Sequence, residues 1–285
     1  MLKEGAGERQ GGSLRAGWYS WATVAMRVIV ERLSKTYRDR GGHDVVALED
    51  VGLTVEPEEF VAILGPSGCG KSTLLNVVAG LLPPTSGQVF FQGERRPNQP
   101  LTATVFQEFA LFPWRTAEAN VAFGLEELDI PGAERRARVH RFIAMTGLEG
   151  FEAKYPHQLS GGMRQRVGIA RALCVEPAVL LMDEPFSALD AQTRTIMMDE
   201  LLGIWERTRT GIVYVTHNIQ EAVYMADRVV VLSRRPGRVL DVVPVELKRP
   251  RVESQLGEPD FLQAVDRIWG LIKSQAKAVL LEGRP

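Results

Sequence analysis

The stretch that most constrains this chain is a glycine-rich loop placed directly after a short apolar run. Residues 60–64 are continuously apolar, which predicts a buried strand, and they lead into Gly-x-x-x-x-Gly-Lys-Ser at 65–72. A helical pattern follows at 74–79. Strand, loop and helix in this order are the context that a Walker A phosphate loop requires, and a chance glycine-rich turn would not match at both flanks. The sequence therefore predicts a nucleotide site here.

The residue types of the loop suit a polyphosphate. Glycines permit the backbone angles that wrap successive N–H groups around an anion, and the following helix directs its positive end at the same anion. Lys71 is expected to reach the β- and γ-phosphates, and the Ser72 hydroxyl is expected to ligate Mg²⁺. The predicted nucleotide contacts of the loop are Gly65, Pro66, Ser67, Gly68, Cys69, Gly70, Lys71, Ser72 and Thr73.

Composition limits the possible partners and compartments. A chain of 285 residues can hold one α/β domain with an inserted or appended subdomain. Its net charge of -1 and pI near 6.5 give no general attraction to nucleic acid or to anionic lipid. Two cysteines do not make a disulfide framework. Cys69 lies beside a lysine and a helix start, which favours an acidified, reactive thiol, although a small residue that merely fits the loop is the commoner case.

The first 25 residues are rich in Gly, Arg and Ser, and we interpret them as a disordered leader. A signal peptide is the alternative, but Ser20 and Thr23 interrupt its apolar part. Met26 opens a good strand and is a second candidate start. No run is long enough to predict a transmembrane helix.

The first half of the chain predicts strands and then helices. Residues 26–31 and 45–55 suggest antiparallel strands around a turn at 39–42, with Tyr37 between them as either an adenine-stacking ring or an ordinary strand tyrosine. Strands are also expected at 89–91 and 102–106, and Gln107 follows the second one. Helical spacing marks Ala117–Leu128, Ala133–Thr146 and Gly161–Leu173, which indicates an all-helical insert at about 108–174. Its Phe112–Trp114 loop is either core or a docking surface.

The second half carries the remaining polar groups with chemistry. Ser160 is a good N-cap, and Gly161 and Gly162 leave the following helix N-terminus bare for an anion. The apolar run 178–182 predicts a central strand that ends in two acids. Of these, Asp183 is expected to hold Mg²⁺, with Gln107 bridging the metal and the attacking water, and Glu184 is expected to polarise that water.

Two more features complete the pattern. Another buried strand, 211–216, is followed by His217, whose imidazole can touch a γ-phosphate. At the end of the chain, Glu258–Leu281 reads as an amphipathic helix with Phe261, Val265, Ile268, Trp269 and Ile272 on one face. We expect this helix to pack on its own domain, and a regulatory or dimer contact is the minor alternative.

Taken together, this ordered set resembles the nucleotide-binding subunit of ATP-binding cassette (ABC) transporters over roughly 26–240. The resemblance implies an α/β P-loop NTPase (RecA-like) core with an antiparallel β subdomain and the inserted α-helical subdomain. The implied domains are the leader 1–25, the ATPase 26–240 and the tail 241–285. The implied roles are the A-loop for Tyr37, the Q-loop for Gln107, the signature motif for 159–165, the D-loop for Asp190 and the switch histidine for His217.

The resemblance also implies partners. In this family two copies pair head to tail, so Ser160 and Gly162 of one copy close on the γ-phosphate held by Lys71 of the other. Two transmembrane permease subunits are implied, with a periplasmic or extracellular solute-binding protein acting through them. The ATPase is then peripheral, on the cytoplasmic face of the inner membrane, and nucleic acid is not a partner.

Finally, six stretches resemble the nitrate/sulfonate/taurine importer ATPases, namely 109–116, 120–125, 159–166, 216–222, 226–233 and 235–238. The loop Leu-Phe-Pro-Trp at 111–114 and Asn218 after the switch histidine depart from the commonest form of that group, so the small anionic or organic solute is not determined. One competing hypothesis is a soluble ABC ATPase that acts on nucleic acid or ribosomes. The other is a P-loop kinase, against which the signature and the Asp183–Glu184 pair both count.

Overall fold

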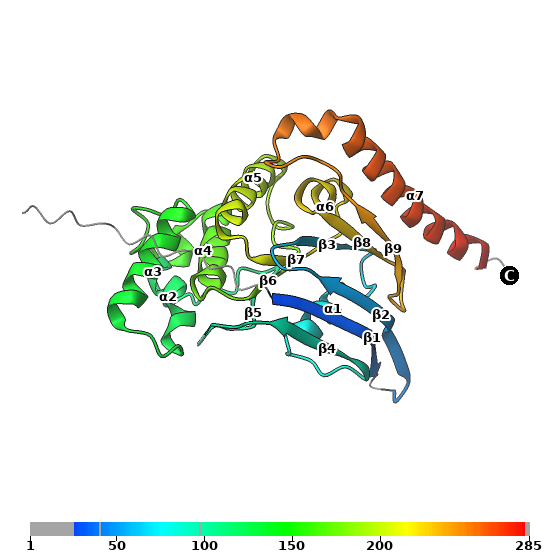
Figure 1. The fold of residues 1–285 in the computed structure, drawn as a ribbon, viewed down its shortest axis with the longest axis horizontal. Coiled ribbons are helices and arrows are strands. Elements are labelled where there is room, and N and C mark those ends of the chain that lie inside the picture. Colours follow the sequence, from blue (N-terminus) through cyan, green and yellow to red (C-terminus); the bar gives the residue numbers. More distant parts are fainter. Residues whose placement is uncertain (1–25, 40, 97, 283–285) are drawn as a thin grey trace, which may run out of the picture.

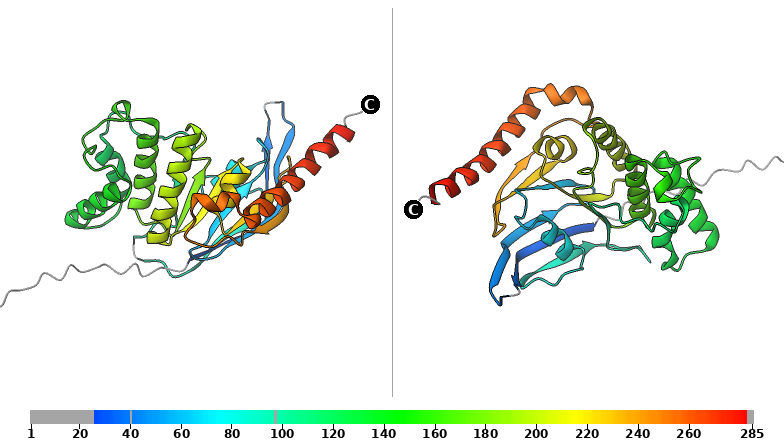
Figure 2. Two further views of the ribbon diagram at one scale, coloured as in Figure 1. Left: turned by 90° about the horizontal axis from the view of Figure 1, so that it is seen from above. Right: turned by 180° about the vertical axis from the view of Figure 1, so that it is seen from behind.

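The computed structural model describes residues 26–39, 41–96 and 98–282, so the predicted leader lies outside the described residues. Within this part of the chain, the strands form one sheet of six and one of three. Helices α2, α3 and α4 gather as a lobe at one end of the molecule, and α7 lies at the other end (Figure 1). The same division is seen from above and from behind (Figure 2).

The six-stranded sheet carries the phosphate loop on an interior strand. Its order is β5 (Thr102–Val105), β6 (Val179–Asp183), β7 (Gly211–Thr216), β3 (Phe60–Leu64), β8 (Arg228–Leu232) and β9 (Val239–Pro244). The first five strands are parallel, and β9 pairs with β8 antiparallel. Every residue of β3 is buried. Alternate side chains of this strand enter two different cores, one on each face of the sheet.

One of these cores lies between the sheets. The three-stranded sheet has the order β2 (Asp44–Val55), β1 (Met26–Arg38) and β4 (Ser86–Gly93), and both of its pairings are antiparallel, as predicted for its first two strands. Helix α1 (Lys71–Val78) shares a core with this sheet and with one face of the larger sheet. The helix that follows the phosphate loop is therefore held by apolar contacts from two sheets.

The other core covers the opposite face of the large sheet. Helices α5 (Ala191–Thr208) and α6 (Ile219–Met225) supply most of its helical side chains near β3, and it continues into the helical lobe. The lobe contains α2 (Ala117–Glu126), α3 (Gly132–Met145), the short helix η1 (Pro156–Gln158) and α4 (Gly161–Cys174). Helix α4 contacts α2, α3 and also β5, so it joins the lobe to the sheet.

The fully buried Asn120 on α2 holds the loop that precedes this helix. Its side-chain oxygen accepts a hydrogen bond from the Phe112 N–H at 2.8 Å. Its amide nitrogen donates to the carbonyls of Phe112, Arg115 and Thr116 at 3.0–3.2 Å. Phe112 also packs edge-on against Phe123 of α2, with ring centroids 4.5 Å apart. Trp114 in the same loop is left 72% exposed.

The tail requires two corrections to the predictions. The boundary at residue 240 falls inside β9, because the first residues assigned to the tail complete the edge of the large sheet. Helix α7 (Pro259–Glu282) forms close to its predicted limits, but Trp269 is 54% exposed and not on the buried face. Among residues 259–275, the part of α7 whose burial is described, Phe261, Ala264 and Ile268 are buried.

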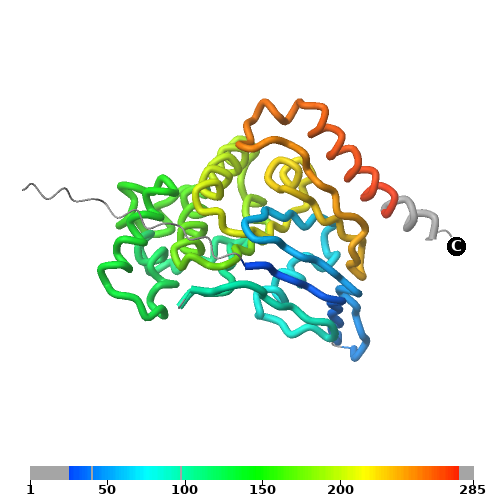
Figure 3. Tube along the Cα trace, in the orientation of Figure 1, coloured from blue at the N-terminus to red at the C-terminus, as the bar shows by residue number. Residues whose placement is uncertain are grey.

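The chain between β9 and α7 is fastened to the domain by two arginines. It leaves β9, passes the ends of α5 and α6 through η2 (Glu253–Gly257), and enters α7 (Figure 3). Arg249 lies over the Trp205 ring at 4.0 Å and pairs with Asp227 at 2.8 Å. Arg251 donates to the Ala226 carbonyl at 3.0 Å. Of the helices described, none is both long and apolar enough to cross a bilayer.

Phe60 provides a test of this packing. Its ring is fully buried and meets the rings of Trp205 and Tyr214 at 6.0 and 5.7 Å. Replacement of Phe60 by Ala is expected to lower the free energy of unfolding by about 3–5 kcal/mol, measured by chemical denaturation, because a cavity opens beside β3. The control, Ile196→Ala at an exposed position of α5, should change it by less than about 0.5 kcal/mol. Equal effects of the two variants would contradict this account of the core.

Candidate functional site

Four neighbouring strand ends bring the predicted polar residues to one edge of the large sheet. Strands β5, β6, β7 and β3 are adjacent and parallel, so their carboxyl ends lie side by side. Gln107 follows β5, the Asp183–Glu184 pair ends β6, His217 follows β7, and the phosphate loop follows β3. Residues far apart in the sequence therefore meet because of strand pairing.

The phosphate loop has the backbone that its glycines allow. Gly68 and Gly70 have φ values of 76° and 109°, and Gly70 is the N-cap of α1. A Cβ atom on Gly70 would lie 2.8 Å from the Ala47 carbonyl oxygen, so the loop also packs too tightly there for a side chain. The Lys71 side chain is only 5% exposed, and its Nζ donates to the carbonyls of Gly65 and Pro66 at 2.9 and 3.3 Å.

Glu184 stands between two groups of the site. One of its carboxylate oxygens lies 3.6 Å from Lys71 Nζ, and the other lies 2.8 Å from His217 Nδ1. Its backbone has a φ of 43°, in the left-handed region that a residue with a side chain enters at a cost of about 1 kcal/mol. The Glu184 N–H donates to the Val215 carbonyl of β7 at 2.9 Å, which holds the residue in this conformation. The strain turns its side chain toward the phosphate loop and the histidine.

Ser72 and Asp183 are the pair that suits a divalent cation. The Ser72 hydroxyl donates to Asp183 Oδ1 at 3.1 Å, linking the start of α1 to the end of β6. Burial raises the pKa of Asp183, and the hydrogen bond from Ser72 acts in the opposite direction. Hydroxyl and carboxylate oxygens, together with the Gln107 amide oxygen, are hard donors of the kind that Mg²⁺ prefers. The residues present therefore fit a magnesium ion.

A cavity of about 570 Å³ opens over the phosphate loop. Tyr37 lies at this cavity, 38% exposed, with its hydroxyl 3.3 Å from Thr73 Oγ1. The predicted residues that line it are Tyr37, Ser67, Gly68, Gly70, Lys71, Ser72, Thr73, Gln107 and Glu184. Four more lining residues were not assigned to the site from the sequence, Asp39, Val45, Ala47 and Arg235. They reach the cavity through tertiary packing, and none of them lies in a motif that predicts nucleotide contact.

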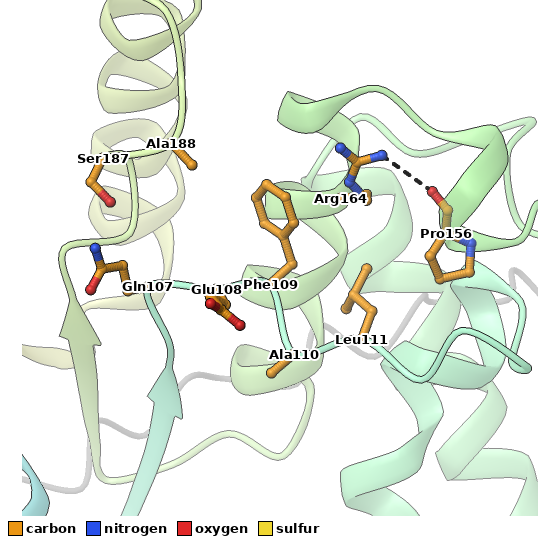
Figure 4. A pocket seen from close by; sticks show the side chains of 9 residues that line it. All are labelled: Gln107, Glu108, Phe109, Ala110, Leu111, Pro156, Arg164, Ser187 and Ala188. Atoms are coloured by element: carbon orange, nitrogen blue, oxygen red, sulfur yellow. Dashed lines mark hydrogen bonds between the residues drawn. The ribbon is translucent and has the colours of Figure 1, made fainter.

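A second cavity, of about 640 Å³, adjoins the first through Gln107, which lines both. Figure 4 shows Gln107 and Ser187 on one side of this second cavity, Pro156 and Arg164 on the other, and Phe109 between them. Arg164 lies over the Phe109 ring at 5.1 Å and donates to the Leu159 carbonyl at 2.8 Å. We call this cavity the lobe groove, lined by Gln107, Glu108, Phe109, Ala110, Leu111, Pro156, Arg164, Ser187 and Ala188.

The serine and glycines of the predicted signature, and Asp190, lie outside both cavities. Ser160 caps α4 by accepting from the Met163 N–H, and Asp190 caps α5 by accepting from the Thr193 N–H at 3.0 Å and its hydroxyl at 2.7 Å. These hydrogen bonds lower the pKa of Asp190. Ser160, Gly161, Gly162 and Asp190 line neither cavity. A single chain therefore does not bring its signature to its own phosphate loop.

Cys69 differs from the acidified thiol considered from the sequence. Its side chain is buried, and burial raises its pKa, although the Lys71 charge acts in the opposite direction. A Cβ on Gly65 would lie 2.7 Å from the Cys69 sulfur, so the thiol fills the inside of the loop. The alternative, a small residue that fits the loop, matches this packing.

Comparison with known proteins gives the family. The ABC transporter family model matches residues 48–187. An uncharacterized ABC transporter ATP-binding protein of Methanocaldococcus jannaschii is 47% identical over 88% of this chain and 93% of that protein. The taurine import ATP-binding protein TauB of Escherichia coli strain K12 is 43% identical over 87% of this chain and 98% of its own length. This chain belongs to the ATP-binding proteins of ABC transporters.

Solved structures of ABC ATPases have the same fold as this chain. A dimeric ATP-binding cassette bound to ADP and Pi in a post-hydrolysis state superposes with a TM-score of 0.66 and 35% identity, covering 78% of this chain and all of that one. The protein cbiO1 of Clostridium perfringens, part of the ABC transporter complex cbiONQ, has a TM-score of 0.67 and 29% identity over 86% and 98% of the two chains. The predicted α/β P-loop fold is confirmed, and the chain is an ATPase of this family.

The two cysteines of this ABC ATPase should be nearly inert to alkylation. Burial raises the pKa of Cys69, and it raises that of Cys174 to about 12, so little of the reactive thiolate exists near neutral pH. Iodoacetamide at about pH 8 should label both residues at least ~100-fold more slowly in the native protein than in guanidinium, followed by mass spectrometry. Fast labelling of Cys69 in the native protein would contradict this expectation and support the acidified thiol considered from the sequence.

Proposed function

We propose that this chain is the energy-coupling ATPase of an importer for a small anionic or organic solute of the nitrate, sulfonate or taurine kind. The observation that carries the proposal is the meeting of Lys71, Glu184 and His217 at adjacent strand ends, in a chain 43% identical to a taurine import ATP-binding protein. The subunit would work on the cytoplasmic face of the inner membrane with two permease subunits, which a solute-binding protein supplies from outside.

In this proposal the phosphate loop binds ATP. Lys71 is expected to exchange its loop carbonyl partners for the β- and γ-phosphates, since a bound polyphosphate offers stronger, charged acceptors. Tyr37 lines the same cavity, and its ring is proposed to stack on the adenine. Ser72 and Asp183, with Gln107, would hold Mg²⁺, which neutralises charge on the phosphates when bound.

Hydrolysis would depend on Glu184. A water oxygen forms a bond to the γ-phosphorus while the bond to the β–γ bridging oxygen breaks, and Glu184 accepts the proton of that water. The 2.8 Å contact with His217 would orient the carboxylate, and His217 itself is expected to contact the γ-phosphate. Without such positioning a flexible carboxylate would spend little time in line with the reacting atoms.

The signature motif completes the site from a second copy. Ser160, Gly161 and Gly162 head a helix of 14 residues whose N-terminus is exposed, and they lie outside the cavity of their own chain. A helix N-terminus stabilises an anion, so the signature of one copy can close on the γ-phosphate held by the other. The predicted head-to-tail dimer with two ATP molecules satisfies this requirement in both halves at once.

The lobe groove is the proposed docking site for a permease segment. It is lined by apolar side chains from three parts of the chain, and its Gln107 also faces the nucleotide cavity. Binding or loss of the γ-phosphate in the nucleotide cavity can therefore change the lobe groove through the side chain of Gln107, which lines both. Trp114, in the loop held by Asn120, is 72% exposed and offers a further apolar side chain for a partner protein.

The base can be tested by replacing Glu184 with Gln. Hydrolysis should slow by roughly 10²–10⁴ while ATP still binds, because the amide keeps the shape and loses the proton acceptor. Steady-state phosphate release measures the rate, and calorimetry measures binding. Glu206→Gln on α5, which removes a charge away from the site, should leave the rate unchanged.

The same variant reports on the composite site. With ATP bound and hydrolysis blocked, Glu184→Gln should accumulate as a dimer in light scattering. A mass that stays monomeric in excess ATP would argue against the head-to-tail arrangement.

Permease docking can be tested by replacing Phe109 with Glu. The added charge should prevent recovery of permease subunits with the tagged protein from detergent-solubilised membranes, while the ATPase rate of the isolated subunit stays within about twofold, because burying an unpaired carboxylate is costly. Phe151→Glu, at another exposed ring of the helical lobe, is the matched control. Recovery of nucleic acid or ribosomes in place of a permease would overturn the transporter assignment and leave the ATPase standing.

A further inference from the structure

A positively charged residue to which the resemblance gives no role lines the nucleotide cavity. Arg235 belongs to the turn 233–238 that joins β8 to β9, and it borders the same cavity as Lys71, Ser72 and Tyr37. Its neighbour Arg234 is also exposed but does not line the cavity. The turn therefore presents one of two adjacent arginines to the site.

The turn is fastened between β2 and the phosphate loop. The Gly237 N–H donates to the Ala47 carbonyl at 2.9 Å, and the Gly237 carbonyl accepts from the Glu49 N–H at 3.0 Å. Within the turn, the Ser233 hydroxyl donates to the Pro236 carbonyl and accepts from the Arg238 N–H. A Cβ on Gly237 would lie 2.2 Å from the Cys69 carbonyl oxygen, so this close approach requires glycine. The position of Arg235 is thus set by backbone contacts on both sides.

The guanidinium is held at one nitrogen and open at the others. Its Nε donates to the Gly68 carbonyl at 3.2 Å, which fixes the group against the middle of the phosphate loop. Across the described part of the chain, no carboxylate forms an ion pair with Arg235. An arginine is always charged at physiological pH and offers its terminal N–H groups in a planar fork that matches phosphate oxygens.

The acids of the cavity are already engaged with other partners. Asp39 accepts from the N–H groups of Gly41 and His43 at 2.8 Å and lies 3.4 Å from the His43 ring nitrogen. Glu184 is taken by Lys71 and His217. The terminal nitrogens of Arg235 are therefore left to a ligand anion that enters the cavity.

We propose that Arg235 is a nucleotide-binding residue whose guanidinium, anchored on Gly68, contacts the phosphate chain of the bound nucleotide. This inference rests on the proposed function, since it takes the cavity to be the ATP site. The contact is present before and during hydrolysis, so it strengthens binding and leaves the chemical step alone. Its loss should therefore raise Kd and KM and leave kcat nearly unchanged.

The test is calorimetric titration with Mg²⁺ and ADP. Arg235→Ala is expected to raise the Kd for ADP by about 5- to 20-fold, the effect typical of one charge-assisted hydrogen-bonded contact. Arg235→Lys, which keeps the charge without the fork, should fall between Arg235→Ala and the unmodified chain. Arg234→Ala is the matched control and should bind as the unmodified chain does. The affinity for adenosine, which has no phosphates, is measured by competition and should be the same in all of these proteins.

Each other outcome has a distinct meaning. If the unmodified chain does not bind ADP, or if Lys71→Ala binds it equally well, the proposed nucleotide site is wrong, and the inference that rests on it is wrong too. If ADP binding depends on Lys71 but is unchanged within twofold in Arg235→Ala, the inference is wrong. It is also wrong if Arg235→Ala leaves ADP affinity intact and only weakens the ATP-dependent dimer of Glu184→Gln, because Arg235 then meets a second copy. If Arg235→Ala loses as much affinity for adenosine as for ADP, the substitution has distorted the cavity, and the inference is wrong as well.

Discussion

The site depends on the burial of one cation. Lys71 is almost fully enclosed, and an ammonium group removed from water is costly unless oxygens replace its hydration shell. Two carbonyls of its own loop and the carboxylate of Glu184 supply these oxygens. That arrangement is possible only because β3 and β6 lie on either side of β7 with their ends aligned. The same alignment places His217 against Glu184. The packing of three strands therefore sets the positions of Lys71, Glu184 and His217 relative to one another.

Sequence patterns predicted the parts of the fold that depend on interactions between residues close together in the chain. The strand, loop and helix at 60–79 need only apolar spacing and glycines, and they form as expected. The exposure of Trp269 could not be predicted from the local sequence pattern. Helical periodicity says that Phe261, Ile268 and Trp269 lie near one stripe, but it does not say how far the partner surface extends along α7. The extent of packing depends on α6 and β9, which are distant in the sequence.

The residues of the cavity divide in the same way. Lys71, Ser72 and Glu184 have backbone positions that their motifs dictate, so sequence spacing identifies them. Asp39, Val45 and Ala47 come from the antiparallel sheet and its turn, and Arg235 comes from a turn pinned by Gly237. Their presence follows from how the two sheets and the phosphate loop pack together, and no pattern of residue types records that packing. Strand β9 was missed for a related reason, because it is a short edge strand whose pairing with β8 defines it.

The separation of the signature from the phosphate loop has a kinetic consequence. Ser160 heads α4 in the helical lobe and does not line the cavity that Lys71 lines, so in the proposed dimer each ATP site needs residues of two chains. In that proposed arrangement, turnover by free subunits would be second order in protein and would fall on dilution. Two subunits tethered to one pair of membrane proteins experience a high effective concentration of each other instead. In the proposed assembly, the membrane complex would thus serve as a scaffold that makes the turnover of each complex independent of the concentration of free subunits.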